Sequence, residues 1–286
     1  MGQSKKKGER GKGKSRKVIF FTILLVLSMV IFFTLRKELP EEEPDYPIIP
    51  SPTPPVEKKV PAKPPALPRL ALIIDDGGYN TEAFKGMMGM GRPMTFSILP
   101  NTPHAWEAAL MAHQEGSEVM LHLPMEPEEG ELLPLEKDTI RTGMSARGIQ
   151  KILQEDLMQI PYVRGVNNHM GSKATADPKV MRALMGTLKK EGLYFIDSHT
   201  TFQTLGPEIA QRAGVASWHN SRFIDREKNT EAIKREIRFA MRKAKKEGKA
   251  VAIGHPHPLT ARAIKEMIPE IEREGIRLVF ASEVVG

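Results

Sequence analysis

The sequence of 286 residues predicts an α/β fold: a parallel sheet forming a (β/α) barrel, with helices on its outer face. Three observations predict it. From residue 69 onward, short apolar segments alternate with amphipathic stretches, which is typical of parallel strands joined by helices. Several expected helices are followed directly by glycine, as at a helix C-cap. Seven or eight such units in about 218 residues favour a barrel, complete or incomplete, over an open sheet.

The first segment, residues 1–17, is a basic tail. It contains eight Lys or Arg and one Glu, which accounts for the whole formal net charge of +7. Because the rest of the chain is balanced in charge, the basic total does not indicate a nucleic-acid partner.

Residues 18–35 form an apolar segment without a charge, about the minimum length for crossing a bilayer core of ~30 Å. Basic residues crowd its N-terminal side, so the positive-inside rule places residues 1–17 in the cytoplasm. We expect a single-pass signal anchor in the inner (cytoplasmic) membrane, with the following domain facing the periplasm or cell exterior. A cleaved signal peptide is the alternative, but Leu35-Arg36-Lys37-Glu38 is a poor cleavage site.

Residues 36–68 are expected to be a disordered, Pro-rich linker. Residues 40–68 contain 11 of the 23 prolines, a composition that favours an extended polyproline-like spacer. The linker leaves residues 69–286 as the folded domain.

Within that domain the apolar runs predict eight strands, and the helical periodicity predicts seven helices between them. The expected strands are Leu70–Ile74, Met94–Ile98, Val119–Leu121, Val163–Val166, Leu193–Ile196, Val215–Trp218, Ala250–Ile253 and Arg277–Phe280. The expected helices are Thr81–Met90, Pro103–Glu115, Ser145–Gln159, Pro178–Glu191, Pro207–Ala213, Thr230–Glu247 and Thr260–Glu274.

Polar residues follow these strands, at the carboxyl ends where parallel β/α folds place their chemistry. The first strand is followed by Asp75-Asp76-Gly77-Gly78, which by itself could also be a solvated turn. Six of the eight histidines follow expected strands, whereas His104 and His113 belong to a helical pattern and are expected at the surface. The six are His122, His169, His199, His219, His255 and His257. Their convergence on one rim predicts a functional site.

The chain has no cysteine, so any metal must be bound by His, Asp or Glu. Such a ligand set suits Zn²⁺ or another borderline divalent ion. With three protein ligands and an open position, the ion would lower the pKa of a water and polarise a carbonyl group. A free carboxylate would accept the water's proton, and a histidine would protonate the leaving group.

Five segments resemble the divergent polysaccharide deacetylase family, a bacterial branch of the polysaccharide deacetylase superfamily. The segments are Leu72–Gly78, His122–Pro127, Asn167–Ser172, Asp197–His199 and Gly254–Pro258, in the family's order. The resemblance covers residues 69–285. It implies a distorted (β/α)7 barrel, a divalent metal that is usually zinc, and a carbohydrate substrate.

By the same resemblance, Asp75 would be the general base and Asp76 a metal ligand. The superfamily's second motif has two histidines four residues apart. His122 matches the first, but Glu126 stands at the place of the second, so Glu126 and His169 are both candidates for the remaining ligand position. His255 matches the general acid best. The matching segments further contain candidate substrate-binding residues, namely Asn168, Asp197, His199 and His257.

The leading functional hypothesis is therefore metal-dependent deacetylation of an N- or O-acetylated cell-envelope carbohydrate. A catalytically weak or inactive glycan-binding or scaffold protein on the same barrel is the alternative. A phosphoesterase is a third possibility with less support, because only Arg164 and Lys173 are basic candidates near strand ends. The glycan, the acyl group and the oligomeric state are not predicted.

Overall fold

The computed structural model describes residues 28–31, 67–128 and 134–286. Residues 28–31 are helical and exposed. None of the helices formed by the described residues combines the length and apolar character that crossing a bilayer requires. Of the predicted anchor 18–35 only residues 28–31 are described, and of the predicted linker 36–68 only residues 67 and 68. The predicted tail 1–17 lies outside the described residues. These three segments therefore remain predictions.

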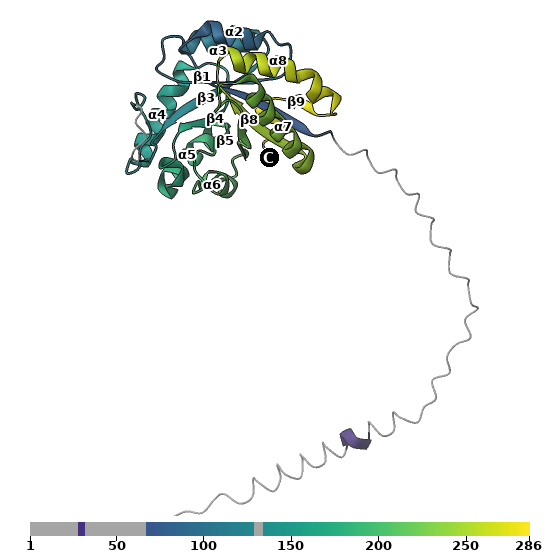
Figure 1. The fold of residues 1–286 in the computed structure, drawn as a ribbon. Coiled ribbons are helices and arrows are strands. Elements are labelled where there is room, and N and C mark those ends of the chain that lie inside the picture. The colour runs from purple at the N-terminus through teal and green to yellow at the C-terminus, as the bar shows by residue number, and fades with distance from the viewer. Residues whose placement is uncertain (1–27, 32–66, 129–133) are drawn as a thin grey trace, which may run out of the picture. The chain divides into compact units, whose positions relative to one another are not determined.

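The domain alternates strands and helices along its length (Figure 1). The strands are β1 (Arg69–Gly77), β2 (Thr95–Ile98), β3 (Glu118–Met125), β4 (Val163–Met170), β5 (Tyr194–Asp197), β6 (Ser217–His219), β7 (Arg222–Phe223), β8 (Lys249–Gly254) and β9 (Arg277–Val279). The helices are α2 (Thr81–Met88), α3 (Ala105–Gln114), α4 (Ala146–Gln159), α5 (Pro178–Glu191), α6 (Gly206–Ala213), α7 (Thr230–Glu247) and α8 (Pro258–Arg273), with short 3₁₀ turns at Ala174–Ala176 and Ala281–Glu283.

The strands of the described domain form one parallel sheet in the order β6-β5-β4-β3-β2-β1-β8-β7, with β9 also paired to β1. The two edge strands are nearly continuous in sequence, because only Asn220 and Ser221 separate β6 from β7. Asn220 N donates to Asp197 O (2.7 Å) at one edge, and Ser221 N donates to Val251 O (2.9 Å) at the other. This segment draws the two edges together, so the sheet curls into the barrel-like form expected from the sequence.

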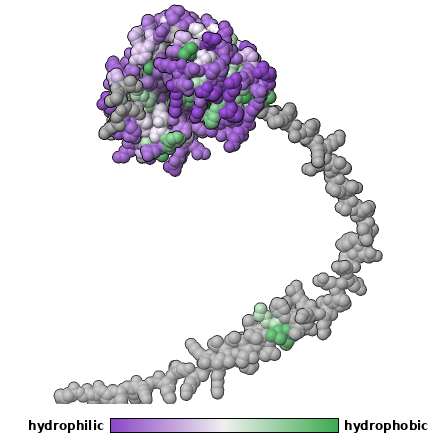
Figure 2. All heavy atoms as spheres, viewed as in Figure 1, coloured by the Kyte–Doolittle hydropathy of each residue, from purple (hydrophilic) through white to green (hydrophobic). Residues whose placement is uncertain are grey.

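Side chains alternate between two cores, as the period of two along a strand requires. One face of β1 packs Leu70, Leu72 and Ile74 against the helices, whereas Ala71 and Ile73 face the interior of the curled sheet. Figure 1 shows the helices around the outside of the sheet, and Figure 2 shows a mostly hydrophilic outer surface on the same side. Burial on both faces explains why the sequences of these strands are continuous apolar runs.

The predicted helices agree well with those of the structure, whereas several predicted strands end earlier than the observed ones. Helices Pro178–Glu191 and Thr230–Glu247 have the expected bounds, and Gly192 and Gly248 end them with φ of 68° and 78°. In contrast, β1, β3 and β4 continue beyond their apolar runs into polar residues. The reason is that backbone pairing continues, for example between His122 and Asn167, whatever the side chains are. Many of the polar residues expected after the strands therefore lie within them.

Candidate metal centre

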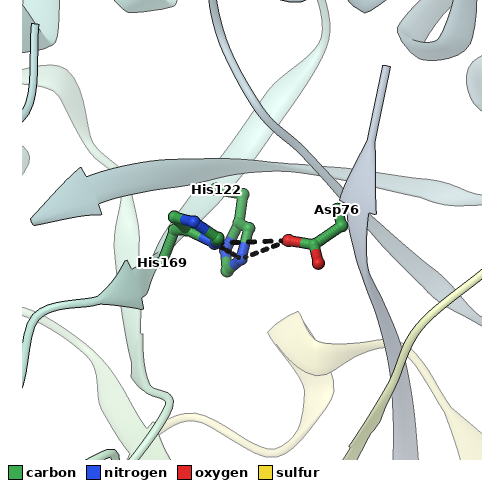
Figure 3. Close-up of side chains that lie close together, drawn as sticks. All are labelled: Asp76, His122 and His169. Atoms are coloured by element: carbon green, nitrogen blue, oxygen red, sulfur yellow. Dashed lines mark hydrogen bonds and ion pairs between the residues drawn. The ribbon is translucent and has the colours of Figure 1, made fainter. Parts of the chain in front are cut away.

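Three side chains from three strands meet at the carboxyl end of the sheet (Figure 3). They are Asp76 of β1, His122 of β3 and His169 of β4. Asp76 Oδ1 lies 3.3 Å from His122 Nε2 and 3.2 Å from His169 Nδ1. The two histidine nitrogens lie 3.1 Å apart. The three donor atoms thus form a nearly equilateral triangle.

Asp76 reaches this triangle because β1 contains a bulge. Ile74 pairs with Phe96 and Gly77 with Ile98, so two residues of β1 stand opposite one residue of β2. Asp76 takes a left-handed conformation, with φ of 57°. Consecutive residues of a regular strand face opposite sides, but the bulge brings Asp75 to the same centre, with Oδ2 3.6 Å from His122 Nε2.

The two glycines after the carboxylates allow close backbone approach. A Cβ on Gly77 would lie 2.2 Å from the Phe84 ring, and one on Gly78 would lie 2.0 Å from Thr102 Oγ1. Gly78 also has φ of 109°, which favours glycine. The turn therefore holds the end of β1 against α2 and the loop after β2.

The three donor atoms fit a divalent metal. Asp76 Oδ1 is buried and makes no hydrogen bond of acceptable geometry, although two imidazole nitrogens lie beside it. Tetrahedral ligands at ~2.0–2.1 Å from an ion are about 3.3 Å apart, close to the edges of 3.1–3.3 Å found here. Two nitrogens and one carboxylate oxygen suit Zn²⁺ or another borderline ion.

Asn167 lies directly behind the triangle and is fully buried. Its Nδ2 donates to Asp75 Oδ1 (2.9 Å), and its Oδ1 lies 2.8 Å from His122 Nδ1. Ser97 Oγ donates to the same Oδ1 (2.5 Å). Asn167 lies in one of the five segments quoted from the sequence, but no role was predicted for it.

Burial and close charges perturb the titrating groups of the centre. Burial raises the pKa of Asp75 above its usual value, against the lowering influence of His122 and His255. Burial alone would also raise the pKa of Asp76, but the close imidazoles of His122 and His169 hold it well below its ordinary range. Burial would lower the pKa of His122, yet the two carboxylates raise it. The centre thus holds a strongly ionised Asp76 beside a less acidic Asp75.

His255 lies across the centre from the triangle, with Nε2 3.9 Å from Asp76 Oδ2. Its Nδ1 is 2.9 Å from Asp225 Oδ1, and its backbone N donates to Asp225 Oδ2 (2.6 Å). Although burial acts to lower it, the pKa of His255 is raised to about 9 by Asp225 and the carboxylates of the centre. The Phe223 ring stacks on the imidazole at 6.4 Å. His255 is therefore oriented and protonated at neutral pH.

Asp225 was not identified from the sequence. It follows β7, which has only two residues and therefore no recognisable apolar period. The available signal was the Phe223-Ile224-Asp225 sequence, in which an acid follows apolar residues as Asp75 and Asp197 do.

Glu126 does not belong to the triangle. Its Oε2 accepts hydrogen bonds from Thr142 N (2.6 Å) and Thr142 Oγ1 (2.7 Å), and its Oε1 accepts one from Lys173 Nζ (3.0 Å). The groups positioned to hold a metal among the described residues are Asp76, His122 and His169. Of the two candidates, the structure brings His169, and not Glu126, beside Asp76 and His122.

Two expected substrate-binding residues are buried beneath the rim loops. Asn168 donates to Met170 O (2.7 Å) and accepts from Ser198 N (2.8 Å). Asp197 accepts from His199 N (2.7 Å) and Thr204 Oγ1 (2.5 Å). Their side chains support the loop backbone, and with exposed fractions of 1% and 0% they present no surface to a substrate.

The other two expected residues are partly exposed. The His199 ring lies 5.8 Å from the His219 ring, beside β5 and β6. His257 caps α8, because its Nδ1 accepts from Leu259 N (3.2 Å). With Asp225 and His255 it borders a cavity of about 270 Å³. His104, which precedes α3, and His113 on α3 are exposed, as expected.

The sequence and the fold both match known proteins. The family model described as divergent polysaccharide deacetylase matches residues 72–285. The uncharacterized protein YibQ of Escherichia coli (strain K12) is 38% identical over 218 residues, which cover 76% of this chain and 67% of that protein. A solved structure of an uncharacterized protein from Agrobacterium tumefaciens C58 has a TM-score of 0.73 at 22% identity, covering 79% of this chain and 92% of its own.

A second solved structure is the catalytic domain of peptidoglycan N-acetylglucosamine deacetylase from Eubacterium rectale ATCC 33656. It has a TM-score of 0.50 at 15% identity and covers 76% of this chain and 89% of its own. At these identities the two structures show a shared fold, that of a curled, parallel α/β barrel.

Proposed function

The chain belongs to the divergent polysaccharide deacetylase family, and from this membership we propose that it is a metal-dependent hydrolase that removes acetyl groups from an N- or O-acetylated carbohydrate. The observation that carries the proposal is the triangle of Asp76, His122 and His169, flanked by Asp75 and His255. We propose Zn²⁺ as the ion because two imidazoles and one carboxylate suit it.

The residues around the triangle fit the two proton transfers of a hydrolysis. A bound ion would supply Lewis acidity toward a carbonyl oxygen and toward water. Asp75 is the proposed base, since its Oδ1 is held by Asn167 and its Oδ2 faces the centre. His255 is the proposed acid, since Asp225 holds its Nδ1 and leaves Nε2 to donate a proton to the departing nitrogen or oxygen.

We further propose that the carbohydrate belongs to the cell envelope. The sequence supports this, because residues 18–35 are apolar, follow a basic tail and precede a Pro-rich linker. In this arrangement the linker would carry the domain away from the membrane, toward a glycan in the periplasm or at the cell exterior.

Acetate release tests the proposal directly. The full chain is incubated with N-acetylglucosamine oligomers and with O-acetylated glycan, with and without a chelator. We expect release that stops with the chelator and returns with Zn²⁺. Asp76→Asn removes a charged ligand and should lose Zn²⁺ binding and acetate release together. Glu126→Gln is the matched control, and it should retain Zn²⁺ binding because Glu126 contacts Thr142 and Lys173 instead.

Acetate release that persists in chelator would contradict the metal mechanism. Stoichiometric Zn²⁺ binding with no release from any acetylated glycan would favour a glycan-binding protein without turnover.

A further inference from the structure

Asn167 contacts both halves of the candidate site at once. The amide of this fully buried residue reaches Asp75 on one side, and His122 and Ser97 on the other. Its polar atoms are all directed at residues of the centre or their supports. This arrangement is more specific than satisfying one buried polar side chain requires.

The orientation of the amide follows from its partners. An ionised carboxylate only accepts hydrogen bonds, so the Nδ2 group must face Asp75, and Oδ1 must face the other two residues. Because Oδ1 is an acceptor, His122 has to donate to it from Nδ1. The lone pair of His122 is then on Nε2, the atom that lies 3.3 Å from Asp76 Oδ1. Asn167 thus selects the tautomer in which His122 can bind a metal.

The same amide fixes Asp75. The 2.9 Å bond from Nδ2 occupies Oδ1 of this carboxylate and leaves Oδ2 toward the centre. Ser97 in turn holds the Asn167 amide from β2, so the amide cannot rotate without losing a bond on each side.

We propose that Asn167 is a positioning residue with two separable functions: its carbonyl oxygen orients His122 as a metal ligand, and its amino group orients Asp75 as the base. The second function rests on the hydrolase proposed above, whereas the first concerns metal binding alone. The two functions use different atoms, so substitutions can separate them.

Three variants of the full chain distinguish the two functions. Asn167→Asp keeps an acceptor for His122 but removes the donor to Asp75 and places a second negative charge beside it. Asn167→Leu has a similar shape and provides neither group. Asn168→Leu is the matched control, because Asn168 is a similarly buried asparagine on β4 whose amide hydrogen-bonds to the backbone of Met170 and Ser198.

Zn²⁺ affinity is measured by competition with a chromophoric chelator, and kcat and KM are measured by acetate release from N-acetylglucosamine oligomers. Loss of a group that orients a metal ligand typically costs about 10–100-fold in affinity. We therefore expect Asn167→Leu to weaken Zn²⁺ binding by about that factor, and Asn167→Asp and Asn168→Leu to bind within about 3-fold of wild type. Asn167→Asp should nevertheless lose about 100-fold in kcat with little change in KM.

Unchanged Zn²⁺ affinity in Asn167→Leu would overturn the role toward His122, as would an equal loss in Asn168→Leu. Wild-type kcat in Asn167→Asp would overturn the role toward Asp75. A wild-type chain that binds Zn²⁺ but releases no acetate would overturn the hydrolase and the Asp75 role with it, and the affinity series would still decide the His122 role. A wild-type chain that binds no Zn²⁺ would overturn both.

Discussion

Asp156 should make the stability of the domain depend on pH in an unusual direction. It lies on the inward face of α4 with Ile149 and Leu153, and its exposed fraction is 1%. Neither carboxylate oxygen makes a hydrogen bond of acceptable geometry. Burial, followed by repulsion from Asp138 and Glu155, raises the pKa of Asp156 from 3.8 to about 7.

The sign of the effect follows from proton binding. A raised folded-state pKa means that the folded domain binds more protons than the unfolded chain between about pH 4 and pH 7. The free energy of unfolding therefore falls as pH rises through this window, because burial and the neighbouring carboxylates oppose the ionisation of Asp156 in the folded domain. A shift from 3.8 to about 7 corresponds to up to ~4 kcal/mol lost by pH 8.

Asp156→Asn removes the charge and keeps the shape. At pH 8 we expect the variant to be more stable than wild type by up to ~4 kcal/mol, and near pH 4 we expect little difference. Urea denaturation at pH 4.5, 6 and 8 gives the free energies of unfolding. The control is Glu208→Gln on α6, whose exposed carboxylate is paired with Arg212, and it should change stability by less than ~0.5 kcal/mol at each pH. If the free energies of unfolding of wild type and Asp156→Asn change with pH in parallel, the reasoning is refuted.

Two further predictions concern the acid of the site and the opposite end of the strands. Asp225→Asn should lower the pKa of His255 from about 9 toward its ordinary value of 6.5, so the alkaline limb of the pH profile of kcat should move to lower pH. An alkaline limb that does not move would exclude His255 as the acid. Glu118→Leu removes the buried acceptor that Thr95, Tyr194 and Ser282 share. Urea denaturation should show that the free energy of unfolding falls by at least ~2 kcal/mol. Zn²⁺ affinity should stay at the wild-type value, because the candidate metal centre lies at the other end of β3.

Much of the site could be predicted because parallel strands bring their carboxyl ends together. His122, His169 and His255 follow apolar runs, and that pattern alone was enough to place them at one rim. The bulge that turns Asp76 inward was not predictable in the same way. It depends on the pairing of β1 with β2 and on the packing of Gly77 against Phe84, which are contacts between residues distant in sequence.

The choice between Glu126 and His169 also required the structure, and strand geometry explains it. Two residues four apart can share an ion only if the chain turns between them, because in a strand they lie about 13 Å apart. Here β3 remains extended through Met125, so Glu126 is carried beyond the centre, to Thr142 and Lys173. In its place β4 supplies His169, which pairs with Pro124, two residues beyond His122. The length of β3 and its register with β4 therefore determine which side chains form the triangle, and a histidine at position 126 would not join it unless β3 ended earlier.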